Sequence, residues 1–303
     1  MPRSTFTPKE PITKLPLAVR KEIRDQYEAK KGEIEARVAT ALKITKFTFN
    51  LNPNKMWAYN TFDQNAGNVY VEGFANALDA FIEYYGEEGV SEFNTVVTKA
   101  ELTATVNEEG EDAPTITARV QDGVFQILFQ QERLGYNTSL LGRDEILTAV
   151  DSVHRQGLAF EAKASITQNW RPECDDVRGA LAEILDIQDI KLDPNFKDNY
   201  EKVSSEKEDD NSFKRSFGAA TLAYFEGLKN WLESNKVKGD GMVQEAIRES
   251  LSEKTIKLRV VDKVKNGYYC GVAFQDGVLY LETTPTYWYT NTSDIAEKLI
   301  DLL

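Results

Sequence analysis

The sequence predicts an α+β protein of two similar units, each an antiparallel meander sheet with helices packed on one face, preceded by an N-terminal arm and helix. The first sign is a repeated segment. QDGVFQILFQQERLGYNTS begins at Gln121, QDGVLYLETTPTYWYTNTS begins at Gln275, and both open with QDGV and close with NTS. The second sign is the order of elements, because strand, helix, helix, three strands and helix are expected twice. Together they indicate an internal duplication. The alternative is one α+β domain whose hairpins share the commonest turn chemistry.

Residues 1–42 are expected to form an arm and a charged helix. Prolines interrupt residues 1–16, which favours an extended arm. Residues 17–42 carry a narrow apolar stripe among charged side chains, a pattern typical of a peripheral helix or of a helix docked on a partner. Ile23, Tyr27 and Ile34 of this stripe are therefore candidate interface residues.

The first unit is expected over residues 43–156. Apolar residues alternate from Phe47 to Leu51, which predicts a strand, and they recur at helical spacing after it. The expected elements that follow are helices at 74–85 and 90–97, strands at 102–106, 116–120 and 124–129, and a helix at 143–155.

The second unit is expected over residues 157–303 and repeats this order. Residues 192–212 are polar and dense in charge, so we interpret them as a charged loop. The other expected elements are a strand at 160–166, helices at 177–185, 217–232 and 242–251, strands at 256–260, 268–274 and 278–281, and a helix at the end of the chain.

Turn chemistry explains most of the repeated segment. Asp-Gly between alternating apolar runs is a strong hairpin signal, because such turns need positive φ angles. Each QDGV is therefore expected to fold a hairpin. Each Asn-Thr-Ser precedes an apolar periodic stretch, where a side-chain oxygen caps a helix, so we interpret it as a helix start.

Composition limits the class of protein. The net charge is −13 and hydrophobic residues make up 41%, the balance of a soluble globular chain. No apolar run has the length of a membrane helix, and the N-terminus lacks a signal-like apolar segment. Two cysteines are too few for a disulfide framework, so we expect a cytoplasmic, intracellular protein with no membrane partner. The charge disfavours nucleic acid as a partner without excluding a local basic face.

No residue pattern indicates catalysis, a cofactor or a metal. The single histidine, His154, is expected at the C-terminal end of a helix, where the helix dipole favours a cation. Cys174 lies beside acidic residues, which raise a thiol pKa, and Cys270 lies on an expected strand. Zinc needs more histidines and cysteines at closer spacing, and the acidic loops do not have EF-hand spacing. We expect no catalytic, cofactor-binding or metal-binding residues, and an enzyme is disfavoured.

The most unusual stretch is TPTYWYTNT at residues 283–291. In a strand, Tyr287 and Tyr289 would share one face and Trp288 would occupy the other. Exposed aromatic residues are frequent hot spots of interfaces, so Tyr287, Trp288 and Tyr289 are further candidate interface residues. Packing of these side chains in the core is the alternative.

Two functions from different classes follow. The first is a non-catalytic assembly or interaction protein, a self-associating structural component, cellular or viral, whose partner is itself or another protein. The second is a nucleic-acid-associated protein built on tandem sheet-and-helix repeats, by analogy of fold alone.

Overall fold

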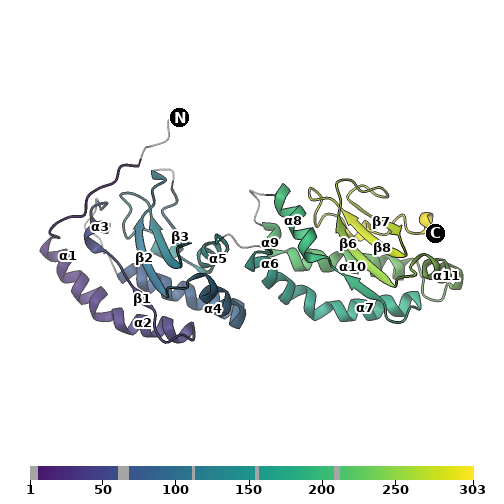
Figure 1. Ribbon diagram of the computed structural model, residues 1–303, viewed down its shortest axis with the longest axis horizontal. Helices are drawn as coiled ribbons and strands as arrows, with labels where there is room; N and C mark the ends of the chain where they lie inside the picture. Colours follow the sequence, from purple (N-terminus) through teal and green to yellow (C-terminus); the bar gives the residue numbers. More distant parts are fainter. Residues whose placement is uncertain (1–5, 61–67, 111–112, 154–156, 208–211) are drawn as a thin grey trace. The chain divides into compact units, whose positions relative to one another are not determined.

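The computed structural model describes residues 6–60, 68–110, 113–153, 157–207 and 212–303. The chain divides into two compact units, Met1–His154 and Arg155–Leu303 (Figure 1). Within the described residues, each unit combines helices with a four-stranded sheet. The α+β class and the pair of similar units are therefore confirmed. The predicted position of His154 at a helix end lies outside the described residues.

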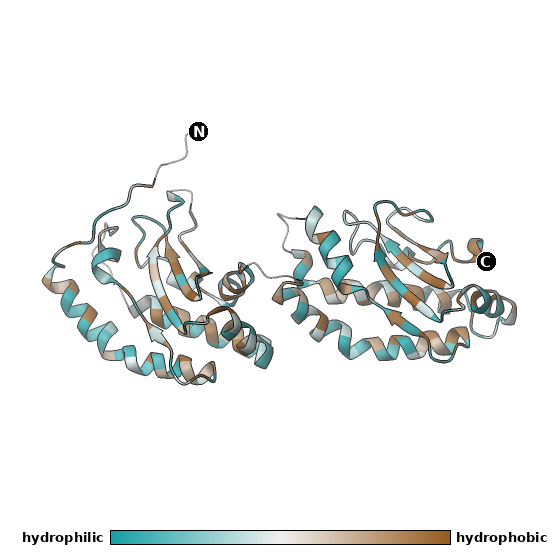
Figure 2. Cartoon of the chain, in the orientation of Figure 1, coloured by the Kyte–Doolittle hydropathy of each residue, from teal (hydrophilic) through white to brown (hydrophobic). Residues whose placement is uncertain are grey.

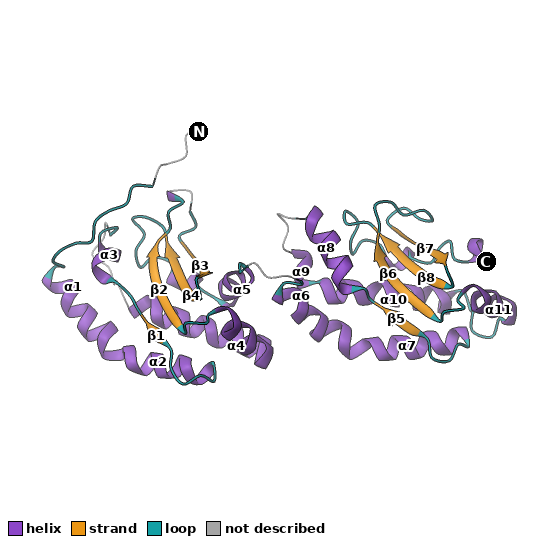
Figure 3. Cartoon of the chain, in the orientation of Figure 1, coloured by secondary structure: helices purple, strands orange, loops and turns teal. Residues whose placement is uncertain are grey.

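The first unit begins with consecutive helical segments, and helices separate its first strand from three consecutive strands that complete the sheet (Figure 3). Gly86, with φ 57° and ψ −142°, is non-helical and divides Asn68–Val96 into two helical segments, in agreement with the two helices expected at 74–85 and 90–97. The elements are α1 (Leu17–Glu22), the π-helical turn η1 (Ile23–Glu28), α2 (Ala29–Ala41), β1 (Thr48–Phe49), α3 (Pro53–Trp57), α4 (Asn68–Val96), β2 (Glu101–Val106), β3 (Ile116–Gln121), β4 (Val124–Phe129), η3 (Thr138–Leu140) and α5 (Arg143–Asp151).

The second unit follows the same plan. Where α4 is bent, the second unit has two separate helices, and Asp240 caps the second of them by accepting a hydrogen bond from the Val243 N–H. The elements are α6 (Phe160–Ser165), the π-helical turn η4 (Ile166–Trp170), α7 (Arg171–Leu185), β5 (Lys191–Asp193), α8 (Phe196–Glu206), α9 (Ser212–Arg215), α10 (Phe217–Ser234), α11 (Gly241–Ser250), β6 (Thr255–Val260), β7 (Cys270–Gln275), β8 (Val278–Thr283), η5 (Thr292–Asp294) and η6 (Ile300–Leu302).

Both sheets are mixed, and they share one topology. The strand orders are β1-β2-β4-β3 and β5-β6-β8-β7. β4 is parallel to β2 and antiparallel to β3, and β8 is likewise parallel to β6 and antiparallel to β7. The expected antiparallel meander is therefore wrong. In the first sheet β3 lies at the edge and β4 returns between β2 and β3, and the second sheet has the same arrangement. Alternation of apolar residues reports which face of a strand is buried and not which strand lies beside it.

One face of each sheet packs against long helices. Hydrophobic and hydrophilic residues alternate along the strands (Figure 2), and Leu102, Ala104 and Val106 of β2 are buried. In the first unit Phe74 of α4 joins helix and sheet, because its ring lies 4.9 Å from that of Phe125 on β4. The opposite face carries polar and partly exposed side chains and is called the open face below.

The QDGV turns have the expected geometry. Asp122 and Gly123 have φ 52° and 76°, and Asp276 and Gly277 have φ 50° and 76°. Two consecutive positive φ angles match the right-handed twist of the flanking strands, which is why Asp-Gly closes both hairpins. The interpretation of this motif as a folding signal is confirmed.

The N-terminal helix is part of the first unit and has a counterpart in the second. A π-helical turn, which is rare, interrupts both helices at the same place, as η1 and as η4. Residues 160–166, expected as a strand, are therefore helical. The buried side chains of the two helices have identical spacing: Ile23, Tyr27, Ile34, Val38 and Leu42 in the first, and Ile166, Trp170, Val177, Leu181 and Leu185 in the second.

Residues 192–212 contain a helix where a charged loop was expected. Tyr200 and Val203 of α8 are buried against the core, although most other positions of this helix are charged or polar. Two or three apolar anchors are enough to hold a short helix on a protein surface, because tertiary packing overrides a polar composition. The composition of the segment therefore misled the sequence-based prediction.

The Asn-Thr-Ser segments do not cap helices with their side chains. Asn137 and Asn291 have φ 52° and 47°, a left-handed conformation that asparagine tolerates, and neither side chain caps the 3₁₀ turn that follows. The helix expected at the end of the chain is replaced by the short turns η5 and η6. Each asparagine therefore supplies the left-handed backbone conformation that precedes its 3₁₀ turn.

Candidate interaction surface

Three tyrosines form a cluster on the surface of the second unit. Tyr268, Tyr269 and Tyr287, called the tyrosine cluster below, have ring centroids 4.6 to 5.8 Å apart. Tyr268 is 72% exposed, and Tyr269 and Tyr287 are partly exposed. A side-chain hydrogen bond with Tyr268 raises the pKa of Tyr287 above its ordinary value, so the Tyr287 hydroxyl stays neutral at physiological pH. The cluster is therefore an aromatic surface that also carries the three tyrosine hydroxyl groups.

The β7–β8 hairpin brings the cluster together. Tyr268 and Tyr269 immediately precede β7, and Tyr287 follows β8 by a few residues. Cys270 at the start of β7 pairs with Thr283 at the end of β8, so the two ends of the hairpin lie side by side. The Thr283 hydroxyl also donates a hydrogen bond to the Tyr269 carbonyl at 3.1 Å. The sequence signal that was missed is the pair of tyrosines in NGYYC, which is placed opposite TYWY once β7 and β8 pair.

Trp288 lies in the core and not on the surface. Its ring stacks on Phe217 at 5.2 Å and lies 5.7 Å from the ring of Tyr224, and only 4% of it is exposed. The expected strand at this position is a turn, in which Tyr289 has φ 66° and points to solvent with 48% of its surface exposed. A turn does not alternate its faces, so the pattern of Tyr287 and Tyr289 against Trp288 did not give the correct orientations.

The candidate interface residues of the N-terminal helix are also internal. Ile23, Tyr27 and Ile34 are buried within the first unit. The Tyr27 hydroxyl donates a hydrogen bond to the Phe49 carbonyl at 3.4 Å, and burial raises the pKa of Tyr27 to about 12. Of the six candidates, the structure leaves Tyr287 and Tyr289 accessible to a partner.

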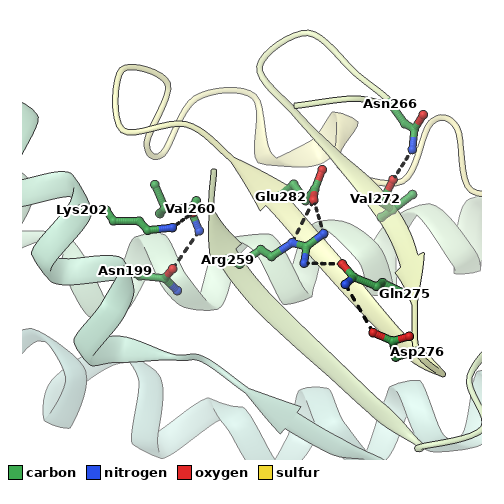
Figure 4. A network of polar contacts seen from close by, with 9 residues as sticks. All are labelled: Asn199, Lys202, Arg259, Val260, Asn266, Val272, Gln275, Asp276 and Glu282. Atoms are coloured by element: carbon green, nitrogen blue, oxygen red, sulfur yellow. Dashed lines mark hydrogen bonds and ion pairs between the residues drawn. The ribbon is translucent and has the colours of Figure 1, made fainter. Parts of the chain in front are cut away.

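A polar network occupies the open face of the second sheet (Figure 4). The guanidinium of Arg259 donates two hydrogen bonds to Glu282 at 2.6 and 2.9 Å and one to Gln275 at 3.0 Å. It also stacks on the Tyr280 ring at 3.7 Å. Lys257, on the same strand, pairs with Asp193 at 2.9 Å. Arg259 and Lys257 are therefore each paired with a carboxylate from the same unit.

Asparagine side chains protect the edges of this sheet. Asn199 of α8 accepts a hydrogen bond from the Val260 N–H at 2.8 Å and donates one to the Leu258 carbonyl at 3.0 Å, where β5 has ended (Figure 4). Asn266 donates to the Val272 carbonyl of β7 at 3.0 Å. These amides occupy backbone groups that another strand would need, which disfavours edge-to-edge pairing at these positions.

The first unit has a cavity on the open face of its sheet. The cavity measures about 440 Å³ and is lined by Val106, Glu108, Glu109, Pro114, Arg119 and Leu128, among others. Glu108 and Glu109 are exposed at its rim. Arg119 donates a hydrogen bond to Gln126 at 2.9 Å. The cavity thus combines an apolar floor with one guanidinium and two carboxylates.

Neither cysteine has the character of a nucleophile. Burial, with the nearby Asp175, raises the pKa of Cys174, and burial raises the pKa of Cys270 to about 12. Thiolates are the reactive form of cysteine, so both thiols are held in the unreactive form.

In the described parts of the chain, histidine, cysteine and carboxylate side chains form no group of three that could hold a metal ion. The described helices include none with the length and apolarity to cross a membrane.

Comparisons with known proteins give no relative. No family model matches the chain, and neither a curated protein nor a solved structure is significantly similar to it.

Proposed function

We propose that the chain is a non-catalytic assembly protein that associates with copies of itself through the tyrosine cluster of its second unit. The observation that carries the proposal is the exposure of Tyr268 beside two further tyrosines. Tyrosine is enriched at the energetic centres of interfaces, because it buries a large area and fixes few rotatable bonds. Grouped aromatic residues on a surface favour an association site, whereas scattered ones need no explanation.

The mode of association follows from the sheet edges. Asn199 and Asn266 occupy edge groups of the second sheet, so a partner would make contact through side chains and not by adding a strand. Free, high-pKa thiols suit an intracellular protein of this kind. The raised thiol pKa values also argue against a cysteine-based enzyme.

Nucleic acid remains the alternative partner, and one observation favours it. Tyr280 on the open face of the second sheet could stack on a base, and it lies beside Lys257 and Arg259. Both cations are paired with Asp193 and Glu282, however, and the net charge is −13. Phosphate binding would require breaking these pairs, so the protein partner is favoured.

Light scattering on the intact chain tests the proposal. We expect mass to increase with concentration, and Tyr268→Ser to raise the dissociation constant by about 30-fold, the size of a hot-spot loss. Met242→Ser is the matched control, because Met242 is 82% exposed on the same unit but away from the cluster. A wild-type chain that stays monomeric at all concentrations contradicts the proposal. Binding of single-stranded nucleic acid that weakens in Tyr280→Ser would favour the alternative.

A further inference from the structure

Two equivalent loops in the two units have opposite chemistry. Residues 107–115 join β2 to β3, and residues 261–269 join β6 to β7, so the loops have equal length and the same place in the topology. The first loop presents the carboxylates of Glu108 and Glu109. The second presents two lysines, Lys263 and Lys265, against one carboxylate, Asp262, together with the exposed ring of Tyr268. The duplicated units have therefore diverged into an acidic surface and a basic, aromatic one.

We propose that the loop at 261–269 of one copy docks into the cavity of the first unit of a second copy. This inference rests on the self-association proposed above and names the acceptor surface. The cavity suits a tyrosine that is preceded by two lysines. Leu128 and Pro114 offer an apolar floor, and Arg119 offers a cation for the face of the ring.

The charges complete the match. Glu108 and Glu109 at the rim of the cavity would pair with Lys263 and Lys265 of the incoming loop. Charge complementarity of this kind selects the partner and sets the register of a contact. It also distinguishes this contact from the pairing of two identical tyrosine clusters, in which lysines would face lysines.

When the loop of one copy occupies the cavity of another, the pair still has one unused loop and one unused cavity. Such head-to-tail contacts continue into open chains or close into rings, whereas a symmetric contact stops at a dimer. The chain is therefore expected to form assemblies larger than a dimer as its concentration increases. Salt should weaken them, because the rim charges are exposed and are screened over about 8 Å at physiological ionic strength.

Reciprocal charge reversal tests the docking mode. One variant carries Glu108→Lys and Glu109→Lys, and a second carries Lys263→Glu and Lys265→Glu. We expect each variant alone to lose assembly by at least about 10-fold in apparent affinity. Mixing the two should restore assembly with the variants in alternation, because the unchanged loop of the first variant fits the unchanged cavity of the second, and the reversed loop of the second fits the reversed cavity of the first. A chain that carries both reversals should recover assembly.

The control is a chain with Glu33→Lys and Glu83→Lys. Both residues are exposed on helices of the first unit and lie outside the cavity. The control changes the net charge by the same amount as the variant with Glu108→Lys and Glu109→Lys. Circular dichroism checks that every variant is folded. If the wild type is monomeric, the proposed function itself fails. If the wild type assembles and Tyr268→Ser weakens it, but the Glu108 and Glu109 variant assembles normally, the acceptor surface is wrong while self-association stands.

Discussion

Tyr224 accepts a hydrogen bond from the backbone N–H of Tyr289 at 2.9 Å, which ties α10 to the segment that follows the last strand. Tyr70 of α4 makes the same bond to the N–H of Gly135 at 2.7 Å in the first unit. Burial raises the pKa of both tyrosines, so each hydroxyl stays neutral. The same bond occurs in both units because a tyrosine of α4 or α10 holds the segment that follows the hairpin of its unit. In the second unit this segment includes Tyr287.

Removal of this hydroxyl should loosen the second unit. Tyr224→Phe leaves the Tyr289 N–H without its partner, and we expect a loss of about 1–3 kcal/mol in the free energy of unfolding. Tyr70→Phe should cost a similar amount in the first unit. Calorimetry on both variants checks this, and an unchanged unfolding profile for Tyr224→Phe would show that the bond is dispensable.

Two equivalent glycines should respond differently to alanine. A Cβ at Gly227 would overlap the Thr292 carbonyl oxygen, whereas a Cβ at Gly73 would lie 3.3 Å from the Thr138 carbonyl oxygen. Gly227→Ala is therefore expected to destabilise by about 1–3 kcal/mol or more through overpacking. Gly73→Ala should leave the free energy of unfolding nearly unchanged, because the preference of a helix for alanine over glycine, about 1 kcal/mol, offsets the close contact of the new Cβ. Thermal melting of both variants measures the difference, and equal melting temperatures would contradict it.

Trp288 should matter for stability and not for association. Trp288→Ala removes a ring that stacks on Phe217, and we expect a loss of about 3–5 kcal/mol through cavity formation. Trp288→Phe is the conservative control. It should cost far less, because the buried indole Nε1 has no hydrogen-bond partner among the described residues. Denaturant unfolding and light scattering separate the two roles: a folded Trp288→Phe protein with impaired assembly would show that the ring contacts a partner.

Asn199 should be essential to the edge of the second sheet. Asn199→Leu keeps the size of the side chain but leaves the Val260 N–H and the Leu258 carbonyl unpaired. We expect a loss of about 2–4 kcal/mol, the cost of two buried unsatisfied groups. Hydrogen exchange reports the effect at the Val260 amide, whose protection should fall most. Ser205→Ala, on an exposed part of the same helix, should leave that amide protected.

Cys270 should be unreactive in the folded protein. Its pKa of about 12 lies far above the ordinary thiol value of 9.0, so almost no thiolate exists at pH 8. Because the folded-state pKa is raised, the associated stability is complete below pH 9.0 and falls as the pH rises toward 12. In a Cys174→Ser chain, alkylation at pH 8 should be slow in buffer and fast in denaturant. Rapid alkylation of the folded chain would contradict the burial of this thiol.

Local chain chemistry determined the turns, the hairpin strands and most helices of this protein. Asp122-Gly123 and Asp276-Gly277 fold the hairpins because these residues readily adopt the positive φ angles that a tight turn needs. Alternation of apolar residues marks the buried face of β2 and β6. The α+β class and the two similar units follow from these local signals. The repeat of the N-terminal helix was missed, although the apolar spacing from Ile23 to Leu42 recurs from Ile166 to Leu185 and is visible in the sequence.

Tertiary packing decided the rest. Nothing local places β4 between β2 and β3, turns Trp288 inward, or folds Phe196–Glu206 into a helix. Each of these depends on partners distant in sequence, such as Phe217 for Trp288 and the edge of β6 for Asn199. The tyrosine cluster has the same origin, because Tyr268 and Tyr287 meet only when β7 pairs with β8. A sequence specifies the conformations that a segment prefers by itself, and the free energy of burial selects among them once distant surfaces meet.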